Sequence, residues 1–142
     1  DGYLILDKLK SEELITLQLA MPAVLMSASS HVRDDYGKVA LMRGPIVYCL
    51  EEADNGNSLH LLSISSDCIF VCEKEESLLG GVVSIHTVGK RYFSSDPGSE
   101  PASLYTPYKK SSFEEVSVKW IPYYSWANRG LGEMSVWISI ES

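Results

Sequence analysis

The stretch KVALMRGPIVYCLEE (residues 38–52) decides the fold. Gly44-Pro45 divides it into two apolar runs, residues 39–42 and 46–50. Short runs of β-branched and aromatic residues between turn formers are typical of strands. Both faces of the second run are apolar, so we expect this strand to be covered on both sides.

Arg43 is the charged residue between these two runs. A buried guanidinium needs a partner, so we interpret Arg43 as a structural arginine that binds a carboxylate or backbone carbonyls. A ligand-binding arginine is the alternative. Gly44 and Pro45 make the turn, and Pro45, which lacks an N–H, suits the first residue of a strand or a bulge. Gly130, later in the chain, is expected to let a loop turn sharply.

Further runs of the same kind lie on either side of this stretch. They predict strands at residues 3–7, 14–19, 23–28, 59–65, 68–72, 82–88, 116–121 and 134–140. The charged residues 73–76 are expected to form a connection, and the Pro/Gly-rich residues 93–103 a mobile loop. Because no segment has a convincing helical period, the sequence predicts an all-β fold. The simplest form is an antiparallel β-sandwich, jelly-roll-like, with little or no helix.

The composition limits the class of partner. The chain has 142 residues and a net charge of −7, without a basic patch, so nucleic acid and anionic membranes are not expected as partners. It starts at Asp1 without a signal-peptide pattern, which suggests a processed chain or a piece of a longer protein. Cys49, Cys68 and Cys72 all lie in apolar runs, which favours a reduced, cytoplasmic protein.

Candidate catalytic and metal sites are few. Neighbouring residues on a strand point to opposite faces, so no acidic doublet gives the facing carboxylates of a glycosidase, and we expect the doublets at the surface. These doublets are Asp34-Asp35, Glu51-Glu52, Glu75-Glu76 and Glu114-Glu115. Cys68 and Cys72 would lie roughly 13 Å apart on a strand, too far for a disulfide. The three histidines are scattered, so no metal site is expected.

The segment IPYYSWANRGLGEMSVW (residues 121–137) is the most distinctive part of the chain. Tyr123, Tyr124 and Trp126 offer aromatic faces, and Asn128 and Arg129 offer donors that could bind a sugar. The interpretation that we favour is that the aromatic side chains close the end of the sandwich while Arg129 ties the loop down. On that interpretation Trp126 is buried and its truncation costs stability.

Two of these segments also carry a family resemblance. VALMRGPIVYCLEEADN (residues 39–55) and IPYYSWANRGLGEMSVWI (residues 121–138) together resemble the C-terminal end of glycoside hydrolase family 127, the β-L-arabinofuranosidase family. Residues 2–22 resemble the segment just upstream. The resemblance implies a parent with an N-terminal catalytic (α/α)6 barrel, a cysteine nucleophile, zinc and an acid/base glutamate. No cysteine here matches the adjacent pair of the zinc site, so no catalytic residue is carried over.

The resemblance implies a non-catalytic C-terminal accessory domain, without a cofactor or metal of its own. Such a domain would pack against and stabilise the catalytic barrel of the parent enzyme. The alternative is a carbohydrate-binding module that uses the surface at residues 123–129. We expect residues 23–131 to form the compact sandwich. Residues 1–22 and 132–142 would be terminal strands that pair with each other, as a remnant of a preceding sandwich, and whose uncovered apolar stripe favours a homodimer.

Overall fold

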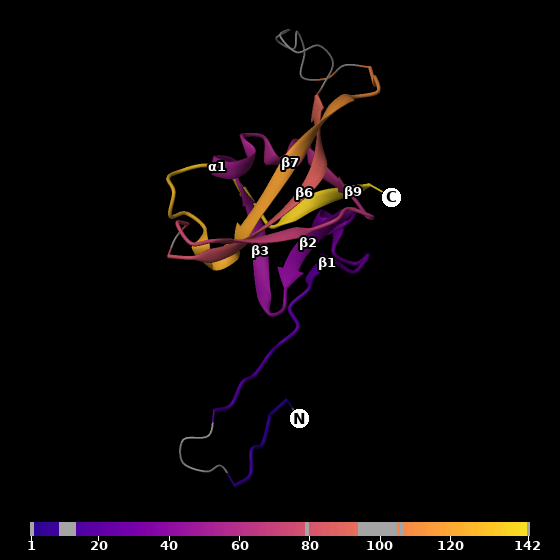
Figure 1. Ribbon diagram of the computed structural model, residues 1–142. Coiled ribbons are helices and arrows are strands. Elements are labelled where there is room, and N and C mark those ends of the chain that lie inside the picture. The colour runs from indigo at the N-terminus through magenta and orange to yellow at the C-terminus, as the bar shows by residue number, and fades with distance from the viewer. Residues whose placement is uncertain (1, 9–13, 79, 94–104, 106, 142) are drawn as a thin grey trace.

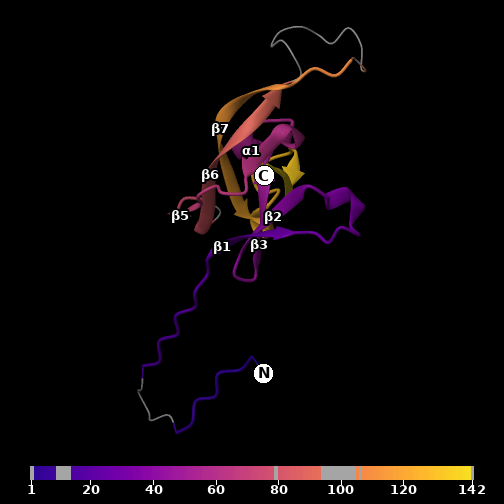
Figure 2. The same ribbon diagram turned by 90° about the vertical axis from the view of Figure 1, so that its right-hand side faces the viewer.

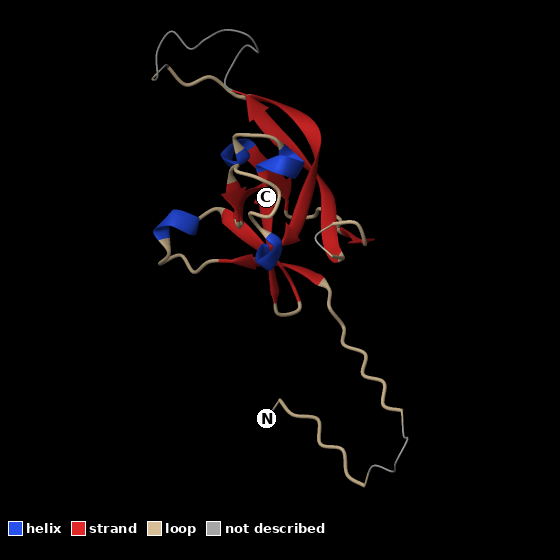
Figure 3. Ribbon diagram, turned by 90° about the vertical axis from the view of Figure 1, so that its left-hand side faces the viewer, coloured by secondary structure: helices blue, strands red, loops and turns tan. Residues whose placement is uncertain are grey.

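The structure is a computed structural model that describes residues 2–8, 14–78, 80–93, 105 and 107–141. Nine strands lie in this described part: β1 (Ala23–Ser27), β2 (Lys38–Arg43), β3 (Ile46–Glu51), β4 (Leu62–Ser65), β5 (Val71–Glu75), β6 (Val82–Phe93), β7 (Ser112–Pro122), β8 (Met134–Ser135) and β9 (Trp137–Glu141). The helical elements are single turns: α1 (Glu52–Asn55), η1 (Arg33–Asp35), η2 (Leu59–Leu61) and η3 (Tyr123–Ser125). The prediction of an all-β fold with little helix is confirmed (Figure 3).

Six strands form a closed, barrel-like ring. They are hydrogen-bonded in the order β2, β9, β4, β6, β7 and β3, and β3 pairs with β2 to complete the circle. Every pairing is antiparallel except that between β4 and β9, which is parallel. β1, β5 and β8 add to β2, β6 and β3 at the edges. The layers expected of a sandwich are therefore parts of one sheet that bends round on itself (Figure 1).

The core fills this ring and includes the stretch that opened the sequence analysis. Tyr48 and Leu50 of β3 join the core cluster, in which Trp120 is the largest fully buried side chain. Cys49, between them, is also fully buried although it points the other way, so at this position β3 is covered on both faces as predicted. Close packing requires glycine at position 89 of β6, because a Cβ there would lie 2.6 Å from the Ser63 carbonyl oxygen.

Three predictions about the middle of the chain need correction. The strand predicted at residues 68–72 begins three residues later, since β5 covers Val71–Glu75. It therefore includes most of residues 73–76, which we expected to form a connection. Its charged residues can lie in a strand because β5 is an edge strand, bonded only to β6 and largely exposed. The strand predicted at residues 59–65 begins instead with η2. The loop predicted at residues 93–103 lies outside the described residues, apart from Phe93 at the end of β6.

The prediction that the terminal strands pair with each other is wrong. Residues 2–8 and 14–22, here called the N-terminal arm, contain no strand and extend away from the ring (Figures 1 and 2). β9 lies between β2 and β4 instead, and its Ile138 is buried in the core. The physical reason is that an alternating apolar sequence forms a strand only where a partner edge exists. The start of the compact unit at residue 23 stays a prediction.

Glu141, at the end of β9, accepts hydrogen bonds from three side chains. Lys90 Nζ, Ser63 Oγ and Tyr92 OH lie 2.5, 2.5 and 2.6 Å from its carboxylate oxygens. These hydrogen bonds lower the pKa of Glu141 from 4.5 to about 2. A carboxylate with a lowered pKa stabilises the fold above its unfolded pKa, and this contribution is lost as the pH falls through the folded pKa.

We therefore expect the free energy of unfolding to fall as the pH is lowered from 4.5 to about 2. At neutral pH Glu141→Gln should cost about 1–2 kcal/mol, because the hydrogen bonds are charge-assisted but partly exposed. Urea denaturation at several pH values should show this difference shrinking as the pH falls. Glu76→Gln is the control, since the ion pair between Glu76 and Lys74 is exposed. A difference that stays constant would contradict the role of Glu141.

Candidate functional site

The candidate site is the aromatic loop, defined as residues 123–133, which joins β7 to β8. The loop starts as η3 and then turns sharply at two positive φ angles, +66° at Ala127 and +109° at Gly130. The second angle is one that favours glycine, which explains why Gly130 stands there. The amide of Ala127 donates a hydrogen bond to Glu51 Oε1 at 2.9 Å. The loop is thus held by the end of β3.

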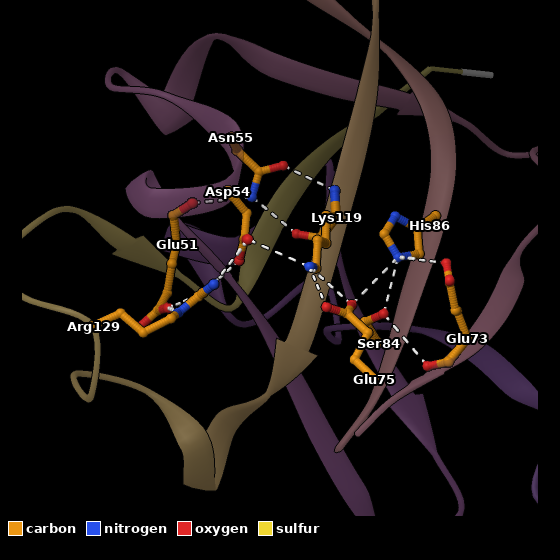
Figure 4. A network of polar contacts seen from close by, with 9 residues as sticks. All are labelled: Glu51, Asp54, Asn55, Glu73, Glu75, Ser84, His86, Lys119 and Arg129. Carbon is orange, nitrogen blue, oxygen red and sulfur yellow. Dashed lines mark hydrogen bonds and ion pairs between the residues drawn. The ribbon is translucent and has the colours of Figure 1, made fainter. Parts of the chain in front are cut away.

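Arg129 is the main anchor of the aromatic loop. Its Nε donates to Glu51 Oε2 at 3.0 Å and its Nη1 to Asp54 Oδ1 at 2.9 Å, while its Nη2 contacts both carboxylates (Figure 4). Glu51 is only 6% exposed, so its charge is removed from water and needs this partner. The guanidinium therefore ties the loop to β3 and α1, as in the interpretation that we favoured.

The network continues from Asp54 across the sheet. Lys119 Nζ on β7 lies 3.5 Å from Asp54 Oδ1 and 2.8 Å from Glu75 Oε1, and His86 Nε2 lies 3.8 Å from Glu75 Oε1 (Figure 4). Burial raises the pKa of Asp54, but Arg129 and Lys119 outweigh it and hold the pKa below its usual range. The hydrogen bond from Lys119 likewise lowers the pKa of Glu75. Charges of opposite sign alternate in this network, so Asp54 and Glu75 stay ionised.

Asn55 fixes the turn that carries Asp54. Its Nδ2 donates to the carbonyl oxygens of Glu51 and Lys119 at 3.0 and 2.9 Å, and its Oδ1 accepts from the Lys119 amide at 2.9 Å. α1 ends at Asn55, and Gly56 after it has a φ of +73°. The side chain of Asn55 thus bonds the β7 backbone as a neighbouring strand would.

A second anchor holds the far end of the aromatic loop. Glu133 Oε1 and Oε2 accept from the amides of Ser58 and Leu59 at 3.0 and 2.8 Å, and the Glu133 amide donates to Glu52 Oε2 at 2.8 Å. The backbone hydrogen bonds lower the pKa of Glu133. The doublet Glu51-Glu52 is therefore not the solvated pair that we expected. Glu51 ends β3 and bonds the middle of the loop, and Glu52 bonds the end of the loop at Glu133.

The predicted sugar-binding residues lie together but are used differently. Tyr123 and Trp126 stack on each other, with ring centroids 6.2 Å apart and an interplanar angle of 23°. Asn128 Nδ2 donates to the carbonyl oxygens of Ser125 and Trp126, and Arg129 is bound to Glu51 and Asp54. Because both polar heads are engaged inside the domain, this geometry does not support a sugar-binding surface.

The aromatic side chains also do not close the end of the fold as fully as we expected. Tyr124 is 67% exposed and Trp126 41% exposed. They stay at the surface because the fully buried Trp120, which packs edge-on against Phe70, already fills the core. The prediction that Trp126 is buried is therefore wrong.

The structural residues predicted at the β2–β3 turn are in place, with one difference. Gly44 has a φ of +56°, and a Cβ there would meet Met21 Cε at 2.8 Å. Pro45 is the second residue of the two-residue turn. Arg43 is in none of the ion pairs between described residues, and its buried Nε has no hydrogen-bond partner there. The carboxylate or carbonyl predicted for Arg43 is therefore not found in the described part of the chain, where its side chain hydrogen-bonds Tyr48.

The cysteines do not fit the zinc chemistry that the resemblance places in a catalytic domain. All three are free, and Cys72 is exposed, contrary to the expectation of buried thiols. No group of three His, Cys, Asp or Glu side chains among the described residues could hold a metal ion. Burial, together with the Glu51 carboxylate, raises the pKa of Cys49 to about 12, so its thiol stays protonated. In the same part of the chain, no helix is long and apolar enough to span a membrane.

Neither strand register nor loop composition signalled Glu51, Asp54, Lys119 and Glu133 as one group. Lys119 alternates with the core residues Val118 and Trp120 and so points to the other face of β7, and the sequence held no signal for the carboxylate that it meets there. Comparison with known proteins identifies the family of this chain. A family model described as the glycoside hydrolase family 127 C-terminal domain matches residues 23–139. The chain belongs to this family.

The relatives of this family 127 domain are much longer proteins. It is 36% identical over 126 residues to a non-reducing end β-L-arabinofuranosidase of Bifidobacterium longum subsp. longum, covering 86% of this chain and 19% of the relative. A solved GH127 β-L-arabinofuranosidase from Geobacillus stearothermophilus T6 is 44% identical, with a TM-score of 0.78, over 85% of this chain and 18% of its own. Another GH127 β-arabinofuranosidase is 33% identical, with a TM-score of 0.72, over 85% and 17%. The chain spans about a fifth of their lengths.

Proposed function

We propose that this domain is a non-catalytic accessory domain that packs against and stabilises the catalytic part of a family 127 glycoside hydrolase. The observation that carries the proposal is the match of residues 23–139 to a C-terminal domain that makes up about a fifth of the relatives. The polar groups of the aromatic loop support it, because they are bound within the domain and hold the loop in one conformation. The domain needs no cofactor for this role.

We expect the chain alone to hydrolyse no arabinofuranoside. The protonated thiol of Cys49 is a poor nucleophile, and the other two cysteines form no metal-binding group with described residues. A chromogenic β-L-arabinofuranoside, with and without zinc and a reductant, is the assay, and buffer alone is the control. Turnover that co-purifies with the chain and disappears in Cys49→Ser would contradict the proposal.

The accessory role predicts that the domain stabilises a catalytic part in the same polypeptide. We suggest a fusion in which the first four-fifths of the Geobacillus stearothermophilus relative precede residues 1–142. Its melting temperature should exceed that of the same four-fifths alone, because an interface buries apolar area on both partners. Arg129→Met, which frees the aromatic loop, should reduce this gain. Equal melting temperatures with and without the domain would reject the accessory role.

We also propose that the chain alone self-associates through the N-terminal arm. Leu14 and Leu17 in the arm are 90% and 63% exposed, and large apolar side chains in an extended segment favour pairing with another chain. The C-terminal strand does not contribute as we had expected, because β9 is internal. Light scattering after size exclusion should show a mass that rises with concentration, and Leu17→Lys should reduce it. A strict monomer at high concentration would reject this proposal.

A further inference from the structure

One end of the ring carries three features that the described chain leaves uncovered or without a counter-ion. The first is a shallow apolar hollow on the outside of the sheet, lined by Val47, Tyr123, Met134, Ser135, Val136 and Trp137. The second is the pair of exposed rings of Tyr124 and Trp126 beside it. The third is the guanidinium of Arg43. The N-terminal arm leaves from the same end, where Met21 packs against the β2–β3 turn (Figure 1).

Arg43 differs from the other partly buried cations of the chain. Lys90, Lys119 and Arg129 each bind a carboxylate. Lys38 and Arg91 bind backbone carbonyl oxygens. Arg43 has a buried Nε without a partner and no carboxylate among the described residues. Its side chain hydrogen-bonds Tyr48 and offsets part of the rise in pKa that burial causes there, and Tyr124 acts on the same hydroxyl. Arg43 and Tyr124 therefore both lie near the Tyr48 hydroxyl. A group from outside the described chain can supply the partner that Arg43 Nε lacks.

We infer that this end of the ring contacts the polypeptide that precedes the domain in family 127 enzymes. We call this surface the docking face (Arg43, Val47, Tyr124, Trp126, Val136 and Trp137). The inference rests on the proposed accessory function and adds the surface and its chemistry. The occupant is apolar, to fill the hollow at Val47 and Val136, and it supplies a carboxylate or backbone carbonyl to Arg43. More than four-fifths of each relative lies outside the matched part. The arm tethers that part to this end of the ring, which raises its local concentration there.

Oxidative footprinting of the fusion described above tests the inference. Hydroxyl radicals are applied to the free chain and to the fusion, and oxidation is measured by mass spectrometry. Tyr124 and Trp126 should be oxidised about fivefold more slowly in the fusion, because rings at the centre of an interface lose most of their contact with water. Tyr36, which is exposed on the segment between β1 and β2, is the internal control and should react equally in both.

Arg43→Gln adds a thermodynamic test with Arg33→Gln, an exposed arginine of η1, as the matched control. In the free chain Arg43→Gln should leave the melting temperature unchanged or raise it, because it removes an unpaired, partly buried charge. In the fusion it should lower the melting temperature, because the group that binds Arg43 loses its partner. Arg33→Gln should change neither. If Arg43→Gln lowered the melting temperature of both the free chain and the fusion, the role of Arg43 would be overturned.

The outcomes separate the inference from the proposed function. If Tyr124 and Trp126 are protected and Arg43→Gln lowers the melting temperature only in the fusion, the docking face and the accessory function are both supported. A stabilised fusion that is protected elsewhere on the domain, with Tyr124 and Trp126 still reactive, overturns the docking face and leaves the accessory function standing. A folded fusion without stabilisation or protection rejects both. If the fusion does not fold, the footprint is repeated with the free chain added to the complete relative lacking only its matched part, and the absence of protection there also overturns the inference.

Discussion

Replacing Arg129 with Met is expected to lower the free energy of unfolding by about 3–5 kcal/mol, which is the usual result of removing one partner from a buried ion pair. Glu51 is 6% exposed and would lose its main partner, while Asp54 would keep only Lys119 at 3.5 Å. The loss is a large part of the roughly 5–15 kcal/mol that stabilises a domain. Urea denaturation at neutral pH measures it.

Two controls isolate the effect of the buried charge. Lys74→Met removes the exposed pair with Glu76, and it should cost less than about 1 kcal/mol. The double variant Arg129→Met with Glu51→Met should recover part of the loss, because no unpaired charge remains on β3. If Arg129→Met were as mild as Lys74→Met, the aromatic loop would not depend on this anchor.

Trp120→Ala is expected to cost about 3–5 kcal/mol and Trp126→Ala less than half as much. Trp120 is fully buried in the ring, where its ring packs edge-on against Phe70 at 6.0 Å. Trp126 is 41% exposed and stacks only on one side, against Tyr123. The sequence predicts a buried Trp126 whose truncation costs stability, so this pair of variants also tests the correction that the structure makes.

Both tryptophan variants are measured by urea denaturation. Their slope m is compared with that of the wild type, since a changed slope would indicate a different unfolded or native state. The variant Trp120→Phe retains most of the volume and should recover much of the stability. Equal losses at Trp120 and Trp126 would mean that the aromatic loop is packed more tightly than the exposure of its rings indicates.

The strands around Gly44-Pro45 show how far local patterns reach. Alternation and turn formers identified β2 and β3 to within one residue at each end, because side-chain periodicity and backbone turns are local properties. The same reasoning failed for the N-terminal arm. Its apolar residues alternate as well as those of β9, but no neighbouring edge is available to them in the structure.

The candidate site shows a similar division. The sequence indicated that residues 121–137 form the distinctive segment and that Arg129 ties it down. It did not indicate the partners of Arg129, which are 78 and 75 residues away in the chain. Nor did it show that the Glu51-Glu52 doublet holds the middle and the end of the loop, because two adjacent carboxylates look the same in a sequence whether they face water or the interior.

The sequence by itself determined the all-β class, the positions of most strands and the family resemblance, since these depend on residue type and short-range spacing. Only the tertiary structure decided that the sheet closes through the pairing of β2 with β3, that β9 lies inside it, and that Arg43 has no carboxylate partner in the described chain. These features depend on which strand edges and charges meet across long separations. Such contacts form through the balance of burial and chain entropy over the whole domain, which no local pattern encodes.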